Sequence, residues 1–104
     1  MKVKHPHDGG PHRADIRAAV HRKDETLASV ARKARIPKSY VYQAMSSRIS
    51  PYGEIAIAEF IEIDPRKLWP GRWEKPTPAR EVWLLKNAEK LEAWRGNRLE
   101  DVGR

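Results

Sequence analysis

The sequence predicts an all-α fold: a helix-turn-helix domain followed by an additional C-terminal helix. Two observations lead to this fold class. Apolar residues recur three and four positions apart in successive segments, which is the spacing of one face of an α-helix. Prolines, glycines and hydroxyl-bearing residues separate those segments, and these residue types mark the ends of helices. At 104 residues the chain has the length of one domain with a tail.

The chain opens with residues 1–11, which contain lysine, histidine, glycine and proline without apolar periodicity. We expect a flexible N-terminal arm there. The first helix is predicted over His12–Lys23, where Ile16, Ala19 and Val20 share one face.

A helix-turn-helix is predicted between Thr26 and Ser47. The Thr26 hydroxyl suits an N-cap, because it can accept a hydrogen bond from an unpaired backbone N–H. The buried face of the helix that follows is expected to contain Leu27, Val30, Ala31 and Ala34. Ile36 precedes a proline and is therefore pushed out of helical geometry, which makes the turn. Pro37 then suits the start of a second helix, since its φ is preset and its N–H is not needed.

That second helix, residues 37–46, has an inner and an outer face. Its inner face is expected to contain Val41, Ala44 and Met45. The outer side chains are of types that bond base edges in the major groove, and the predicted base contacts are Lys38, Ser39, Tyr42 and Gln43. Around them lie side chains suited to phosphate oxygens, and the predicted phosphate contacts are Thr26, Arg32, Lys33, Tyr40, Arg48 and Tyr52. A plain helical hairpin in a small bundle is the alternative interpretation of the same pattern.

The remaining helices follow in order. Residues 46–53 are predicted to form a loop, and Glu54–Glu62 a helix that contains the most apolar stretch of the chain. Asp64 and the proline after it open a short helix, with the aspartate as cap. Trp69 and Trp73 are expected to close the bottom of the core.

Residues 74–104 are predicted to form a linker and a last helix over Ala79–Trp94 that Gly96 ends, and the final eight residues are expected to be loose. An apolar stripe on this helix contains Leu84, Leu85, Ala88, Leu91 and Trp94. The stripe can pack on its own core or pair two chains as a homodimer through residues 79–94. We favour pairing, because the proline-containing linker is stiff and extended. A contact with RNA polymerase is a further use of this helix. The domain division is therefore 1–11, 12–73 and 74–104.

The charge of the chain favours an anionic partner. The net charge is +7 and the isoelectric point is about 10.0. No acidic residue lies between Glu25 and Glu54, whereas five basic residues do: Arg32, Lys33, Arg35, Lys38 and Arg48. A one-signed basic face on a small domain is typical of a surface that binds a nucleic-acid backbone. Double-stranded DNA is the predicted partner.

Several other classes of function are excluded or disfavoured. The chain has no cysteine, which excludes disulfides, a thiolate zinc site and a cysteine nucleophile. His5, His7 and His12 are interpreted as part of a solvated basic tail, so no metal ligand is predicted. No nucleophile–base pair or phosphate-binding glycine loop is present, and we predict neither a catalytic residue, nor a cofactor, nor enzyme activity. No apolar run is long enough for a membrane span, and a cytoplasmic location is expected.

Together these residues resemble the Ner family, small DNA-binding regulators of Mu-like transposable phages and their bacterial Ner-like relatives. The resemblance covers His12 to Trp73. It rests on His12-Arg13-Ala14-Asp15, on the helix-turn-helix, on Gly53-Glu54, and on Leu68-Trp69-Pro70-Gly71-Arg72-Trp73, which is similar to that family's Trp-Pro-x-Arg-aromatic ending. The resemblance implies a lambda-repressor-like fold of five helices, no enzyme activity, and transcriptional control by binding operator DNA. One departure is Arg35, which stands where such motifs often carry glycine.

Two functions follow from the sequence. The first is a sequence-specific transcription regulator in which helix 37–46 enters the major groove. The second is a basic helical subunit of a phage or recombination assembly that binds DNA without strong sequence preference. The ratio of specific to random DNA affinity separates them.

Overall fold

The computed structural model describes residues 10–46 and 48–104. Eight α-helices and one short 3-10 helix occur in that part of the chain, and no strand does. The helices are α1 (Arg13–Arg22), α2 (Leu27–Ala34), α3 (Lys38–Met45), α4 (Pro51–Ile61), α5 (Pro65–Leu68), α6 (Pro70–Trp73), α7 (Pro78–Lys86) and α8 (Ala88–Ala93), and the 3-10 helix is η1 (Leu99–Asp101). The all-α prediction is confirmed. The expected N-terminal arm, including His5 and His7, lies almost entirely outside the described residues.

The helix-turn-helix forms where the sequence predicts it. The Thr26 hydroxyl accepts a hydrogen bond from the N–H of Ser29 at 3.1 Å, and the Ser29 hydroxyl accepts from the N–H of Thr26 at 2.8 Å. This reciprocal pair caps the start of α2. The prediction that Ala34 faces the core is wrong, because its side chain is exposed at the end of α2.

The turn between α2 and α3 is a left-handed C-cap built on arginine. Arg35 has φ 61°, and its N–H donates to the carbonyl of Arg32. The next N–H, that of Ile36, reaches back to the carbonyl of Ala31 at 3.1 Å. These two bonds are those of a Schellman motif, which normally uses glycine at the left-handed position. Arg35 therefore makes the expected turn, but a residue with a Cβ is less stable than glycine in this left-handed conformation.

The helix α4 begins earlier than the sequence predicted. The loop prediction for residues 46–53 is wrong at its end, since Pro51 opens the helix from its first position. Gly53 is a helical residue, not a turn residue. A Cβ added there would lie 2.6 Å from the carbonyl carbon of Tyr40 and closer still to its oxygen. Glycine is needed because the backbones of α3 and α4 touch at this point.

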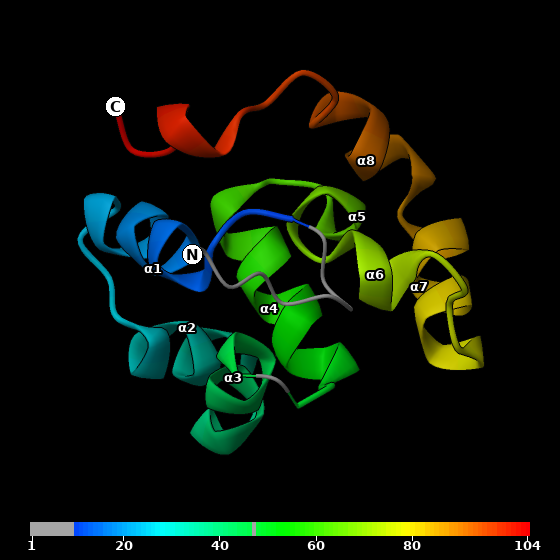
Figure 1. Cartoon of the computed structure of the whole chain (residues 1–104), viewed down its shortest axis with the longest axis horizontal. Coiled ribbons are helices and arrows are strands. Elements are labelled where there is room, and N and C mark those ends of the chain that lie inside the picture. The colour runs from blue at the N-terminus through cyan, green and yellow to red at the C-terminus, as the bar shows by residue number, and fades with distance from the viewer. Residues whose placement is uncertain (1–9, 47) are drawn as a thin grey trace, which may run out of the picture.

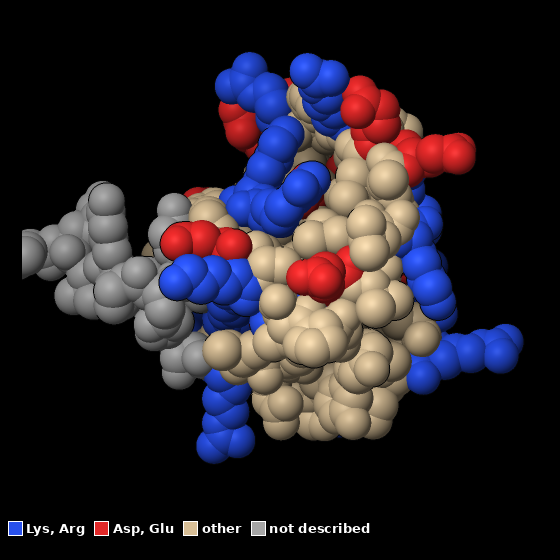
Figure 2. Space-filling model, turned by 90° about the vertical axis from the view of Figure 1, so that its right-hand side faces the viewer, with Lys and Arg blue, Asp and Glu red and all other residues tan. Residues whose placement is uncertain are grey.

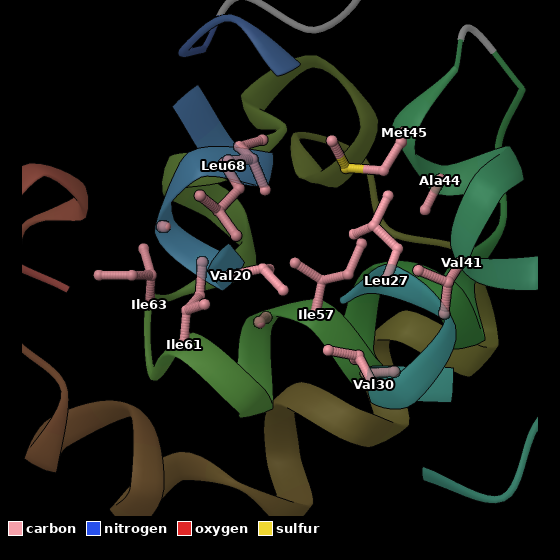
Figure 3. Close-up of a cluster of buried hydrophobic side chains, with 14 of the residues drawn as sticks. Val20, Leu27, Val30, Val41, Ala44, Met45, Ile57, Ile61, Ile63 and Leu68 are labelled. Atoms are coloured by element: carbon pink, nitrogen blue, oxygen red, sulfur yellow. The ribbon is translucent and has the colours of Figure 1, made fainter. Parts of the chain in front are cut away.

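The hydrophobic core is centred on α4 and is covered by α1, α2, α3 and α5. Figure 3 shows side chains from all five helices directed into one cluster. Ile57 of α4 is fully buried within it. As predicted, Trp69 and Trp73 are buried at the edge of this core. The short helix opened by Asp64 ends at Leu68, and a second short helix, α6, begins two residues later at Pro70.

The C-terminal segment packs back on the preceding helices (Figure 1). The single helix expected over 79–94 is two helices, α7 and α8, separated at Asn87. Leu91 and Trp94 are buried, and the Trp83 ring lies 5.9 Å from that of Trp73 and 6.5 Å from that of Trp94. The stripe is thus covered in part within the chain: Leu84 is half-buried, whereas Ala88 is exposed and Leu85 is 75% exposed. The domain boundary after residue 73 stays a prediction.

The prediction that the last residues are loose is wrong. The Arg22 guanidinium of α1 donates to the carbonyls of Val102 at 2.7 Å and Leu99 at 2.8 Å. The Asn97 side chain donates to the carbonyl of Glu62 at 2.9 Å. These bonds hold the segment around η1 against α1 (Figure 1). None of the helices in the described ranges is long and apolar enough to cross a membrane.

Candidate nucleic-acid interface

The outward face of α3 brings the four predicted base contacts together. Lys38, Ser39 and Tyr42 are exposed and Gln43 is half-buried. With Ser46 and Arg48 they line one shallow, open hollow of about 420 Å³. Residues four apart on a helix lie one above the other, so Lys38 stands beside Tyr42 and Ser39 beside Gln43. The result is an eight-residue helix, about 12 Å long, with donors and acceptors along its exposed side.

The start of α3 offers backbone donors as well. Pro37 is its N-cap and makes no side-chain capping bond. The first N–H groups of a helix have no partner within the helix, and the helix dipole makes that end partly positive. An anionic phosphate is the kind of group that such an end binds.

The predicted phosphate contacts on α2 differ in their surroundings. The Arg32 side chain is exposed. The Lys33 ammonium lies 3.3 Å from a carboxylate oxygen of Glu25 and 5.9 Å from the centre of the Phe60 ring. The Ser29 hydroxyl first, and then Lys33, lower the pKa of Glu25 below its ordinary value. Lys33 would have to leave this pair to reach a phosphate.

Thr26 remains suited to a phosphate contact although it caps α2. Its hydroxyl oxygen accepts the Ser29 N–H, and the residue is exposed. A hydroxyl can donate one hydrogen bond while it accepts another. The proton of this hydroxyl is thus suited to a bond with a phosphate oxygen.

Two tyrosines form a pair beside the hollow. The rings of Tyr40 in α3 and Tyr52 in α4 are stacked, with centroids 6.5 Å apart and planes inclined by 23°. Tyr52 is 59% exposed, and Ile49 in the loop between the two helices is 60% exposed. Exposed tyrosines present an apolar ring and a hydroxyl together, which suits contact with sugar and phosphate. Arg48 is exposed in the same loop.

The charge on the surface is divided in space. Figure 2 views the side of the molecule that lies on the right of Figure 1, and it shows acidic side chains over the upper and middle parts of this face and only basic and uncharged ones in its lowest part. The helices α2 and α3 lie at the lower left of Figure 1, on the side turned away from the viewer in Figure 2. Every charged residue within α2 and α3 is basic, and the carboxylate just before α2, that of Glu25, pairs with Lys33. A phosphate backbone that approached this end would therefore meet an excess of cations.

A buried ionic cluster behind α3 was not anticipated from the sequence. Glu54, Arg72 and Arg80 are 0%, 5% and 2% exposed. One carboxylate oxygen of Glu54, Oε1, accepts from Trp73 Nε1 at 3.0 Å and from Arg80 Nε at 3.1 Å and Nη2 at 2.8 Å. The other, Oε2, accepts from Arg72 Nη1 at 3.0 Å and from the N–H of Ser50 at 3.1 Å. We refer to Glu54, Arg72 and Arg80 as the Glu54 cluster.

The cluster also reaches the end of α3. Arg72 donates to the carbonyl oxygens of Ala44 at 2.9 Å and Ser46 at 2.6 Å. A cation at a helix C-terminus is stabilised by the unpaired carbonyls and the dipole of that helix. This contact helps to offset the excess positive charge of two guanidinium groups on one carboxylate. The Arg80 guanidinium lies 5.3 Å from the centre of the Trp73 ring, a further favourable contact for a buried cation.

Other chemistry finds little support in the described residues. They contain no group of three or more histidine, aspartate or glutamate side chains that could hold a metal ion. His12 instead caps α1, where its Nδ1 accepts the N–H of Ala14 at 3.0 Å. The one buried carboxylate that sequence reasoning overlooked, Glu54, is fully engaged by the donors described above.

Comparison with known proteins places these features in context. A family model described as winged helix-turn-helix DNA-binding matches residues 11–82. The chain is 35% identical over 65 residues to sugar fermentation stimulation protein B of Escherichia coli strain K12, across 62% of this chain and 70% of that protein. It is 32% identical over 62 residues to a negative regulator of transcription of Escherichia phage D108, across 60% of this chain and 84% of that protein. No solved structure gives a significant match. The matched range contains α3, every candidate contact and the Glu54 cluster.

Proposed function

The chain belongs to the winged helix-turn-helix DNA-binding family, and from that premise we propose that it regulates transcription by reading one DNA sequence with α3. The relatives agree with the predicted resemblance to the Ner family, and they point to a DNA-binding regulator rather than an enzyme. The observation that carries the proposal is the single hollow that unites Lys38, Ser39, Tyr42 and Gln43 with Arg48.

The proposed mechanism is occupancy of an operator by the helices. The start of α3 enters the major groove, because the outer side chains there have the donors and acceptors that distinguish base pairs. Thr26 and Arg32 on one side, and Tyr40, Arg48 and Tyr52 on the other, hold phosphates and fix the register. Lys33 joins them after it separates from Glu25. No strand occurs in residues 10–46 or 48–104, so the helices carry these contacts without a β-wing.

Selection of bound duplexes from a random pool tests the proposal. A sequence-specific regulator prefers one duplex over random DNA by about 10³-fold or more at physiological salt. The assay is competition at fixed salt concentration between the selected duplex and a scrambled duplex of the same length. A preference below tenfold would refute specific reading and would favour a basic subunit of a larger assembly.

We further propose that two chains pair on DNA through the outward face of α7, within the segment 79–94. Val82 and Leu85 remain 49% and 75% exposed there, three positions apart on one helix. A dimer that reads two half-sites needs its α3 helices about one helical turn, ~34 Å, apart. Sedimentation equilibrium of the wild type and Leu85→Glu tests it. If both proteins sediment as monomers at tens of micromolar, with and without DNA, pairing is refuted. Contact with RNA polymerase would then be the proposed use of this face.

A further inference from the structure

A chain of hydrogen bonds links α7 to the end of α3. Arg80 lies in α7, and its contact with α3 runs through Glu54 and Arg72. We infer that Arg80 is a positioning residue for DNA reading: by occupying Oε1 of Glu54, it leaves Arg72 to cap the end of α3. The inference rests on the proposed function of α3 and adds a structural role for the segment after residue 73.

The hydrogen bonds of the cluster divide the work between the two arginines. Arg80 supplies two of the three donors on Oε1 of Glu54, through Nε and Nη2. Arg72 is thereby limited to Oε2, which it reaches with Nη1 alone. Its Nη2 donates to the carbonyl of Ser46, and Nη1 also donates to that of Ala44. One guanidinium thus bridges the buried carboxylate and the last turn of α3.

Removal of Arg80 changes this division. Oε1 would keep only the indole N–H of Trp73, although a buried carboxylate needs its donors. Arg72 is the cation beside it, and a guanidinium binds a carboxylate most strongly with two parallel N–H groups. A two-point pair with Glu54 would take Nη2 away from Ser46. The end of α3 and the loop that carries Arg48 would then lose the bond that holds them.

Arg80→Gln in the full chain tests the inference, with Arg95→Gln as the matched control. Both variants remove one positive charge from the C-terminal segment, but the Arg95 side chain is 79% exposed and pairs with the exposed Glu92 three residues before it. Circular dichroism at 25 °C establishes that each variant is folded. The first readout is the affinity of each variant for the selected duplex and for the scrambled duplex.

We expect the specific affinity of Arg80→Gln to fall about tenfold further than that of the control, while the scrambled duplex is bound equally by both. The preference for the selected sequence would therefore fall about tenfold. A role confined to stability would lower the melting temperature and leave this preference unchanged in the folded protein. An equal preference in both variants would overturn the inference.

A second readout does not depend on DNA. The backbone amide resonances from Ala44 to Ser46, and their hydrogen exchange, report the cap of α3 directly. We expect them to shift and to exchange faster in Arg80→Gln and to match the wild type in Arg95→Gln. If the wild type shows no sequence preference, the proposed function fails, and these resonances still decide whether Arg80 fixes α3.

Arg80→Lys serves if the glutamine variant does not fold. Lysine retains the charge and a donor for Oε1, but it cannot supply the two-point contact. We expect an intermediate preference and intermediate exchange rates. Values equal to those of the wild type would show that the arginine geometry has no effect on α3 and would overturn the inference.

Discussion

Substitution of Gly53 by alanine tests the close approach of α3 and α4 on which the candidate interface rests. The added methyl carbon would lie 2.6 Å from the carbonyl carbon of Tyr40, whereas ordinary contact begins at 3.4 Å. Relief of this overlap requires the two backbones to separate by at least 0.8 Å, the difference between those distances. Side-chain rotation cannot provide this separation, because the position of a Cβ is fixed by its own backbone and the Tyr40 carbonyl is main chain.

The expected magnitude combines two opposing effects. Overpacking of a tight contact costs about 1–3 kcal/mol, and a backbone overlap belongs at the upper end of that range. Alanine in place of a helical glycine returns about 1 kcal/mol of helix propensity. The net loss in free energy of unfolding is therefore about 2 kcal/mol. For a chain of this size each kcal/mol lowers the melting temperature by about 4–8 °C, so we expect a decrease of roughly 8–16 °C.

Thermal unfolding followed by circular dichroism gives the stability, and duplex competition gives the preference. Gly96→Ala is the control, because Gly96 has φ 91° but no atom within 4 Å of an added Cβ. It should cost about 1–2 kcal/mol through backbone strain and leave DNA preference unchanged. Gly53→Ala should reduce both, since α3 must shift. A Gly53→Ala protein as stable and as selective as the wild type would refute the close-contact reasoning.

Four further substitutions separate the roles of individual side chains. Lys38→Ala should weaken the selected duplex and relax preference at one or two base pairs by about 1–3 kcal/mol; an equal loss on all single-base variants would make Lys38 a phosphate contact instead. Arg32→Ala should weaken selected and scrambled duplexes alike and flatten the salt dependence by about one unit, and an unchanged slope would exclude a phosphate role. Arg35→Gly should raise the free energy of unfolding by about 1 kcal/mol, because its φ of 61° suits glycine. Glu62→Gly, at φ 59° on the end of α4, should give a similar gain without an effect on DNA affinity, and no gain in either variant would count against this account.

Local rules predicted the parts of the fold that local interactions form. The cap at Thr26, the turn before Pro37 and the buried face of α3 depend on neighbouring residues and on helical spacing. The start of α4 was missed because a proline, a tyrosine and a glycine in succession resemble a turn. Their helical state depends on packing against α3, which no local pattern records.

The buried cluster was missed for a related reason. A lone glutamate at the start of an apolar helix is usually a solvated first-turn acid, which the dipole favours. Its partners Arg72 and Arg80 are 18 and 26 residues away, and nothing in their spacing marks them as buried. The sequence offered one indication that Arg72 is special, because Arg72 belongs to the motif that resembles the Trp-Pro-x-Arg-aromatic ending of the Ner family. The packing of α7 on its own chain could not be predicted either, because an apolar stripe on a helix can pack against a second chain or against its own core.

The Glu54 cluster also has a consequence for the order in which the protein forms during synthesis. The core helix α4 carries a carboxylate that Arg72 can neutralise alone, but two of its five hydrogen-bond donors come from Arg80. The later of these two arginines, Arg80, follows Glu54 by 26 residues. Translation at about 5–20 residues per second makes that interval roughly 1–5 s. During those seconds Glu54 has Arg72 as its counter-charge but lacks the two N–H donors of Arg80, and we expect the packing of α3 on α4 to be completed only when α7 arrives.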